Sequence, residues 1–293
     1  MFSRSSASIN LPSMPISISK IINMTTSEDV TIEKLAEVVL MDQTLTSRVL
    51  RLANSVMYAR RQKTGTVTEA VIRLGSSQLR NLAASASVLD AVFPKKSFPG
   101  FDWKEMWNHS VTCAVASQCA YSAITGAIRN TDESAFIAGL LHDVGKMVIA
   151  YALPMKFAEI VAKCCADDWD MNMSEKKFLA TDHASVGSKL ATEWQLPEKL
   201  QIGISYHHNP EAAPEEIDIA RAVCAGNLLA KRLSKCYIFG QSWDVSLEQV
   251  GDSAQLSKPD VARVVSDTRE GLTRCGEIIS WGDNLPSPKK MAA

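Results

Sequence analysis

The sequence has little excess charge of either sign. Its 31 lysines and arginines nearly balance its 32 acidic residues, which leaves a formal net charge of -1. Proteins that bind nucleic acid over a broad surface carry a clear positive excess, so the composition argues against that class. No span of eighteen apolar residues is free of charge, and residues 1–4 do not lead into the apolar core of a signal peptide. We therefore expect a cytoplasmic protein that does not cross a membrane.

Cysteine is present, but not in a pattern that indicates disulfides or a zinc site. The seven cysteines are odd in number and include no CxxC spacing. Reduced thiols that pack as small apolar residues are the expected state. With 293 residues and 46% hydrophobic content, the chain can bury one large core or two modest ones.

Apolar residues recur at helical spacing along most of the chain, whereas alternating patterns typical of strands are too short to count. Thr31 and Asp102 can act as N-caps, and either Thr131 or Asp132 can cap a helix that runs through His142 to Pro154. The predicted helices begin near residue 15 and cover residues 31–40, 45–57, 68–74, 77–92, 102–123, 131–153, 154–166, 174–179, 183–194, 198–208, 217–233 and 258–281.

The prolines and glycine of residues 94–100 interrupt the helical pattern and mark a boundary. The sequence therefore predicts an all-α fold, a multi-helical bundle with an N-terminal helical subdomain. We expect a flexible tail over residues 1–10, an N-terminal helical part over 11–93, a histidine-bearing helical domain over 94–236 and a C-terminal helical extension over 237–293.

All five histidines fall within one stretch of about a hundred residues. They are His109, His142, His183, His207 and His208. Imidazole is a strong ligand for divalent ions at neutral pH, and carboxylates can complete such a site. A metal or phosphate site is the leading hypothesis.

His142, Asp143 and Lys146 interrupt an otherwise apolar segment. Burying unpaired charge there costs several kcal/mol, so partners must exist. In one interpretation Asp143 and Lys146 form an internal ion pair and His142 donates to a carbonyl. In the other, His142 and Asp143 ligate a metal while Lys146 meets a phosphate or the attacking water. The clustering of the histidines favours the second.

The remaining histidines also have simpler explanations. His109 on an amphipathic helix can bond a neighbouring carbonyl, and His183 can be a surface residue in a first turn. His207 and His208 can interact with the dipole at a helix C-terminus.

A series of short motifs runs along the chain. Its segments are VLRLANS at 49–55 with Tyr58, EAVIRLG at 69–75, LRNL at 79–82, WNHS at 107–110, AGLLHDVGK at 138–146, TDH at 181–183 and YHH at 206–208. In this order they resemble the HDOD branch of the HD superfamily of metal-dependent phosphohydrolases, and the resemblance covers roughly residues 11–235.

The resemblance implies an HD-like helical bundle with one or two divalent ions, which could be Fe, Mn, Mg, Zn or Ni. It makes His109, His142 and Asp143 metal ligands, with Asp143 able to bridge two ions. It makes His183, His207 and His208 the additional ligands of a two-metal site, and Glu105 and Asn227 weaker candidates. If the centre is catalytic, the resemblance assigns that role to Asp143 and Lys146.

Two departures count against catalysis. Asn227 falls where the superfamily has its last aspartate, and a neutral amide is a weaker ligand for a hard cation. The segment after His208 also lacks the glutamate and the Gly-Tyr-Pro loop expected of cyclic-di-GMP phosphodiesterases.

The N-terminal half contains a basic group of residues that suits an acidic partner or is simply solvated. It consists of Arg48, Arg51, Arg60, Arg61, Lys63, Arg73 and Arg80. We therefore expect a bacterial-type signalling or regulatory protein with a degenerate metal site, which acts through a protein partner or a phosphorylated small molecule. The alternative is an active phosphohydrolase on a nucleotide or phosphoester. The apolar C-terminal helix could also pair two copies as a homodimer.

Overall fold

The computed structural model describes residues 31–41, 43–55, 64–93, 96–126, 133–167, 169–238 and 241–286. Within these ranges the chain is helical and forms no β-strand, apart from isolated bridges of Phe101 with Phe98 and Ile238. The all-α prediction is confirmed. The expected tail over residues 1–10 and the helix expected near residue 15 lie outside the described residues.

Four of the described helices precede the long central helix. These are α2 (Ile32–Leu40), α3 (Gln43–Ala53), α4 (Val67–Leu74) and α5 (Ser76–Val92), followed by α6 (Trp103–Thr125). The next group is α7 (Ser134–Leu141), α8 (Val144–Ala152), α9 (Pro154–Asp167), α10 (Met171–Leu179), α11 (His183–Glu193), α12 (Glu198–Tyr206) and η1 (Pro210–Ala212). The last are α13 (Ile217–Leu233), α14 (Leu247–Ala254), α15 (Lys258–Arg274), α16 (Gly276–Ser280) and η2 (Trp281–Asn284).

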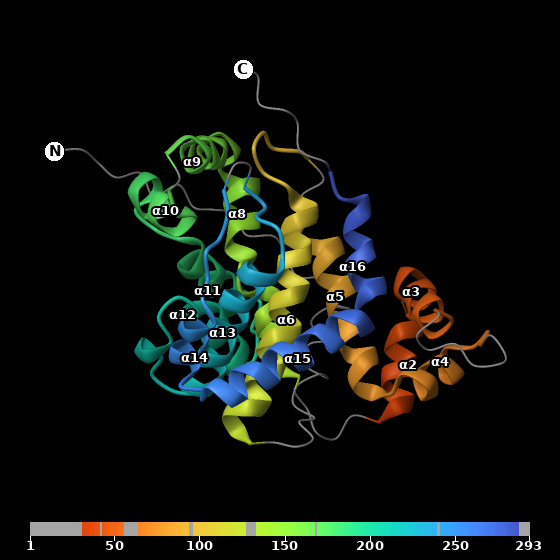
Figure 1. Cartoon of the computed structure of the whole chain (residues 1–293). Coiled ribbons are helices and arrows are strands. Elements are labelled where there is room, and N and C mark those ends of the chain that lie inside the picture. The colour runs from red at the N-terminus through yellow and green to blue at the C-terminus, as the bar shows by residue number, and fades with distance from the viewer. Residues whose placement is uncertain are drawn as a thin grey trace.

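The long helix α6 packs against several of the other helices. Asp102 caps it by accepting hydrogen bonds from the backbone nitrogens of Lys104 and Glu105 at 2.9 and 3.2 Å, as the sequence predicts. Helices α7, α13 and α15 pack directly against α6, as Figure 1 shows. Gly139 on α7 and Gly226 on α13 both face Ser117, and any Cβ at either glycine would overlap α6. The two glycines therefore allow α7 and α13 to lie close to α6.

Two predicted helices are broken in the structure. The helix expected over 131–153 is α7 and α8, separated by a turn at His142 and Asp143. Its N-cap is Glu133 rather than Thr131 or Asp132, because α7 begins at Ser134, and residues 131 and 132 lie outside the described part. The prediction of continuity was wrong because Asp143 adopts φ -99° and ψ 11°, and both Asp and Gly145 are weak helix formers.

The second break interrupts the helix expected over 258–281. Helix α15 ends at Arg274, and the chain bends at Cys275 before α16 begins at Gly276. The bend directs Ile278 and Trp281 into the core, where both are buried. Helix α14, which the sequence analysis does not predict, begins at a capping box formed by Ser246 and Gln249.

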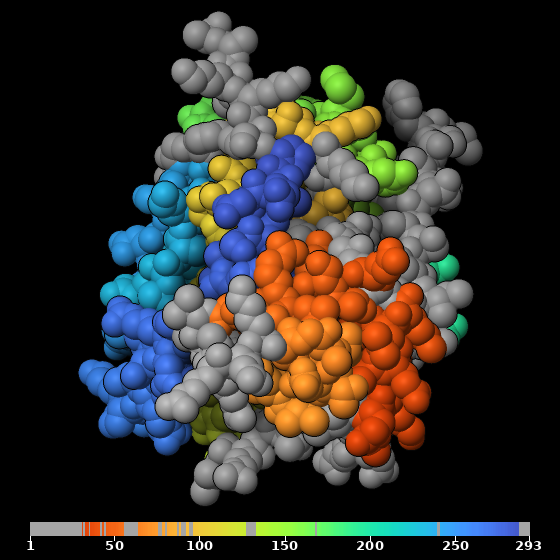
Figure 2. Space-filling model, turned by 90° about the vertical axis from the view of Figure 1, so that its right-hand side faces the viewer, coloured from red at the N-terminus to blue at the C-terminus, as the bar shows by residue number. Residues whose placement is uncertain are grey.

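The C-terminal helices connect the N-terminal helices to α6. The Arg48 guanidinium lies 4.7 Å from the ring centre of Trp281, and Arg51 Nε lies 3.5 Å from Glu277 Oε1. Trp107 on α6 donates its indole N–H to the Ile278 carbonyl at 3.0 Å. Figure 2 shows the dark-blue C-terminal segment against the red and orange N-terminal helices.

Several residues of the predicted basic group contact other parts of the same chain. Arg48 and Arg51 contact the C-terminal helices, and Arg73 donates to the Ala53 carbonyl. Residues 60, 61 and 63 and the side chain of Arg80 lie outside what the structure describes.

One segment, Ser134–Ala152, is long and apolar enough to cross a membrane by length and composition alone. Inside the molecule, 89% of its apolar window is buried. The segment forms a wall of the core and carries the turn at which the candidate site lies.

Candidate metal centre

The five histidines come together from four separate elements. His109 lies on α6, His142 follows α7, His183 opens α11, and His207 and His208 follow α12. The ring centres are 5.3 Å apart for His109 and His142, 5.0 Å for His142 and His207, and 5.5 Å for His183 and His207. The predicted convergence of the histidines on one place is thus present in the structure.

Asp143 lies at the centre of the cluster, with each carboxylate oxygen facing a different pair of histidines. Its Oδ2 is 3.2 Å from His142 Nε2 and 3.7 Å from His109 Nε2. Its Oδ1 is 3.1 Å from His183 Nε2 and 3.8 Å from His207 Nε2. The sequence places these residues in four separate motifs, and one buried carboxylate joins them.

Hydrogen bonds behind the rings fix which nitrogen faces the centre. His142 Nδ1 donates to the Gly139 carbonyl at 2.7 Å, and His207 Nδ1 donates to the Ile204 carbonyl at 2.8 Å. Because a carbonyl can only accept, both Nδ1 atoms carry hydrogen, and Nε2 is the atom left for a ligand. Among the described residues, the buried Nε2 of His207 has no hydrogen-bond partner. This arrangement suits metal-ligating histidines.

Two sets of side chains present atoms close enough to share an ion. In one set, His109, His142 and Asp143 offer ligand atoms that all lie within 4.8 Å of one another. In the other, His183, His207 and His208 do the same. All of them except His208 are buried. The buried His and Asp groups could therefore hold a metal ion, and their donor chemistry fits imidazole-preferring metals such as zinc, iron or nickel.

The electrostatics of the cluster favour ligand-ready side chains. Burial, together with the neighbouring His142, lowers the pKa of His109 well below its usual value, and burial likewise lowers the pKa of His207. Burial opposes the charge of Asp143, but His142 and Lys146 outweigh it and hold its pKa well below the usual value. His109 and His207 are thus neutral beside an ionised carboxylate, and these are the protonation states that metal ligands need.

His142 balances part of the Asp143 charge. Burial disfavours its protonated form, yet the adjacent Asp143 carboxylate raises the pKa of His142 to about 10. A metal ion bound at Nε2 would take the place of that proton.

Lys146 and Tyr237 lie next to Oδ2 of Asp143. Lys146 Nζ is 2.6 Å from Asp143 Oδ2 and donates to the Tyr237 hydroxyl at 2.6 Å. Burial raises the pKa of Tyr237 well above its usual value, so the hydroxyl stays protonated. The Asp143–Lys146 ion pair and the His142 bond to a carbonyl are both present. The ion pair uses Oδ2, the oxygen that also faces His142 and His109, whereas the carbonyl bond of His142 uses Nδ1 and leaves Nε2 for a metal. Tyr237 was not predicted, because no motif surrounds it.

Glu175 on α10 is a second residue that sequence reasoning missed. Its Oε2 accepts the His183 backbone N–H at 2.8 Å and lies 2.5 Å from His183 Nδ1. Burial opposes the charge of His183, but Glu175 and Asp143 outweigh it and raise the pKa of His183. Glu175 is fully buried. A glutamate inside an unbroken helical pattern carries no local signal that would distinguish it from a solvated one.

Replacing Glu175 with glutamine is expected to lower metal affinity about tenfold to a hundredfold, the usual effect of changing a group that orients a ligand. The amide keeps the size of the side chain but removes the charge that holds the His183 ring. Chelator competition with Mn²⁺ or Zn²⁺ measures this change. Glu193→Gln, on the exposed end of α11, is the matched control, and equal affinities in the two variants would contradict an orienting role.

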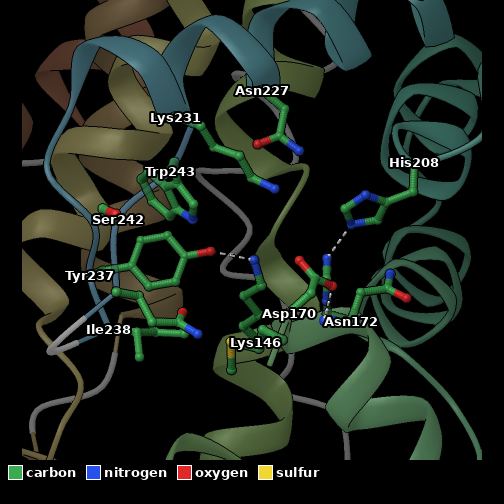
Figure 3. A pocket seen from close by; sticks show the side chains of 13 residues that line it. Lys146, Asp170, Asn172, His208, Asn227, Lys231, Tyr237, Ile238, Ser242 and Trp243 are labelled. Carbon is green, nitrogen blue, oxygen red and sulfur yellow. Dashed lines mark hydrogen bonds between the residues drawn. The ribbon is translucent and has the colours of Figure 1, made fainter. Parts of the chain in front are cut away.

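A pocket of about 190 Å³ opens beside the histidines. Figure 3 shows His208 and Asp170 on one side and Lys231, Asn227 and Trp243 on the other. Asn227 is buried and its Oδ1 has no hydrogen-bond partner within the described ranges. It lines this pocket but belongs to neither set of ligand atoms.

Glu105 does not line the pocket. Its Oε2 instead accepts a hydrogen bond from the Asn108 side chain at 3.2 Å. The roles of Glu105 and Asn227 as ligands remain predictions.

Comparison with known families agrees with these observations. The sequence profile of the HDOD domain matches residues 11–210. The chain belongs to the HDOD family. This match confirms the resemblance inferred from the motifs, and it includes all five histidines and Asp143 of the centre.

Solved structures share the fold of this HDOD protein. An HDOD-domain protein of unknown function from Geobacter sulfurreducens is 26% identical, with 93% of this chain and 92% of that chain covered and a TM-score of 0.73. A protein of Shewanella amazonensis proposed to be a phosphohydrolase is 27% identical, with 94% and 95% covered and a TM-score of 0.70.

A curated relative is an uncharacterised protein of Treponema pallidum (strain Nichols). It is 27% identical over 215 residues, which are 71% of this chain but 39% of that protein. The HDOD chain thus spans well under half of the length of that relative.

Proposed function

We propose that this HDOD protein is a regulatory module that holds two divalent ions at the His/Asp centre and captures the phosphate group of a small molecule. The observation that carries the proposal is Asp143, whose two oxygens face two separate pairs of histidines. When bound, the ions would supply Lewis-acid binding of phosphate oxygens. His109, His142 and Asp143 would hold one ion, and the second set, His183, His207 and His208, would hold the other.

The balance of charge supports capture of an anion. Two divalent ions together with Lys146 bring more positive charge than Asp143 can offset, and Asn227 adds none because its side chain is neutral. Uncompensated charge in a buried site is costly, so an anionic ligand would stabilise the occupied centre. Phosphate, with several negatively charged oxygens, is the chemistry that this site fits best.

Hydrolysis is the second candidate function. It is favoured by Lys146, whose ammonium lies beside Asp143 at the pocket where a phosphate would sit, and by the likeness to the Shewanella amazonensis protein proposed to be a phosphohydrolase. In that case Lys146 would steady the phosphate and Asp143 would bridge the ions. A signalling protein partner is expected in the first function and is not needed in the second.

Elemental analysis and turnover assays on the purified chain separate the two functions. We expect metal in the preparation, and with Mn²⁺ or Fe²⁺ we expect binding of phosphate without turnover of bis(p-nitrophenyl) phosphate or of a nucleotide panel. Turnover by the wild-type protein that disappears in both His142→Ala and Asp143→Ala would show that the protein is a hydrolase rather than a regulatory module. A chain that binds neither metal nor phosphate would exclude both functions.

A further inference from the structure

The pocket beside the metal centre has a second wall that the motifs do not include. Helix α13 contributes Asn227 and Lys231, and the segment that follows contributes Tyr237 and Trp243. Figure 3 shows the Lys231 side chain reaching from α13 into the space between Trp243 and the histidine side. These residues all lie beyond the range that matches the HDOD profile, which ends at residue 210. Asn227 stands where the wider superfamily has its last aspartate, whereas Lys231, Tyr237 and Trp243 belong to none of the chain's motifs.

Lys231 is a cation that forms no ion pair with the residues that the structure describes. Its Nζ lies 6.0 Å from the ring centre of Trp243, and it makes no hydrogen bond within the described ranges. Lys146, by contrast, is bonded to Asp143 and Tyr237. Asp170 also lines the pocket, but its Oδ1 accepts the backbone N–H groups of residues 172 and 173 as the cap of α10.

Asn227 lies one helical turn before Lys231, so the two side chains share a face of α13. Its side chain is more than nine-tenths buried, and its Oδ1 has no hydrogen-bond partner among the described residues. A buried amide oxygen without a partner is costly and is satisfied by a donor, such as water or a protonated phosphate oxygen, whereas the Nδ2 group of the same amide can donate to a phosphate oxygen. The amide and the ammonium therefore form a polar pair that points into the pocket opposite the histidines.

We propose that Lys231 and Asn227 form a second anion-binding subsite, and that the ligand carries two acidic groups, one held at the metal centre and one at Lys231. This proposal rests on the proposed function. At about 190 Å³, the pocket is smaller than the roughly 300–1,000 Å³ typical of sites for drug-sized ligands. The enclosed part of the ligand is therefore compact, with the two acidic groups joined directly or by a short linker, as in a diphosphate.

Paired phosphonates test the subsite without turnover. Methylphosphonate has one acidic group and methylenediphosphonate has two, and neither contains a hydrolysable phosphoester bond. Each compound is titrated calorimetrically into the full chain with free Mn²⁺ held constant. The ratio of the two dissociation constants measures how strongly the site prefers a ligand with a second acidic group. We expect wild type to bind methylenediphosphonate more tightly than methylphosphonate. Lys231→Ala should lose about tenfold or more of the affinity for methylenediphosphonate, as for a lost charge-assisted hydrogen bond. Its affinity for methylphosphonate should change little.

Lys235→Ala is the matched control, because it removes the same charge from an exposed position four residues further along. It is expected to keep the preference, whereas Asn227→Asp is expected to weaken methylenediphosphonate binding by placing a negative charge in the subsite. Stronger Mn²⁺ binding in Asn227→Asp with unchanged diphosphonate affinity would instead make position 227 a metal ligand.

The outcomes distinguish this inference from the function on which it rests. Equal affinity of wild type for the two phosphonates, or an unchanged preference in Lys231→Ala, would overturn the second subsite while leaving phosphate capture intact. Bound Mn²⁺ with no binding of either phosphonate would defeat both.

Discussion

Asp143→Asn is expected to abolish stoichiometric metal binding. The carboxylate faces four histidine Nε2 atoms at 3.1 to 3.8 Å, so the substitution removes the charge shared by both sets of ligands. Changes to groups that only orient a ligand cost about 10–100-fold in affinity, and loss of the shared ligand should exceed that range. Inductively coupled plasma mass spectrometry after dialysis, together with chelator competition, measures the loss.

The same substitution leaves the Lys146 ammonium buried beside a neutral amide. Breaking a buried ion pair costs about 3–5 kcal/mol, so Asp143→Asn should also unfold at a lower temperature by circular dichroism. The double variant Asp143→Asn with Lys146→Met removes both charges, and it should recover much of the stability without recovering metal. Asp252→Asn, on the exposed face of α14, controls for loss of one negative charge. Retained metal in the folded double variant would show that Asp143 does not hold the ions.

Gly145→Ala is expected to have the second large effect, because it separates two helices that hold opposite sides of the centre. A Cβ at position 145 would overlap the carbonyl group of His183 and approach the Gly187 nitrogen within 2.9 Å. These are backbone atoms, so α8 and α11 would have to move apart. Overpacking of this kind costs about 3 kcal/mol, and the displaced His183 should weaken metal binding.

The matched control for this substitution is Gly276→Ala, at the start of α16, where a Cβ would meet no heavy atom within 4 Å. It should leave stability unchanged or raise it by up to about 1 kcal/mol, the difference in helix propensity between the two residues. Gly145→Ala should therefore melt below wild type and bind metal more weakly, whereas Gly276→Ala should melt at or above the wild-type temperature and bind metal normally. A Gly145→Ala protein that melts with wild type and binds metal normally would show that the α8 and α11 contact is not needed for the centre.

The helical class and most helix positions could be predicted from the sequence, because they depend on local periodicity and caps. Asp102 caps α6 and Thr31 caps α2 as the sequence indicates. The errors occur where local signals compete with packing. The turn at His142 and Asp143 lies inside an apolar run that reads as one helix, and the weak helix propensity of Asp143 and Gly145 does not by itself fix where the chain turns, whereas the close packing of α8 on α11 is visible only in the structure.

The metal-centre side chains were likewise predictable, because their residue types and motif spacing are chemically distinctive. The structure brings His109, His142, Asp143, His183, His207 and His208 together. The residues that support them were not predictable. Glu175, Tyr237 and Lys231 look in the sequence like ordinary surface or core residues.

By itself, the sequence determined that the chain is all-helical, that it belongs to the HDOD family, and that five histidines and one aspartate are the candidates for a metal site. Only the tertiary structure decided which histidine nitrogen faces the centre, which glutamate holds His183, and which lysine in the pocket forms no ion pair with the described residues. The physical reason is the separation along the chain of the residues that each property depends on. Periodicity and ligand chemistry are properties of short segments, whereas orientation and pairing depend on contacts between segments far apart in the chain, such as Lys146 with Tyr237, 91 residues away.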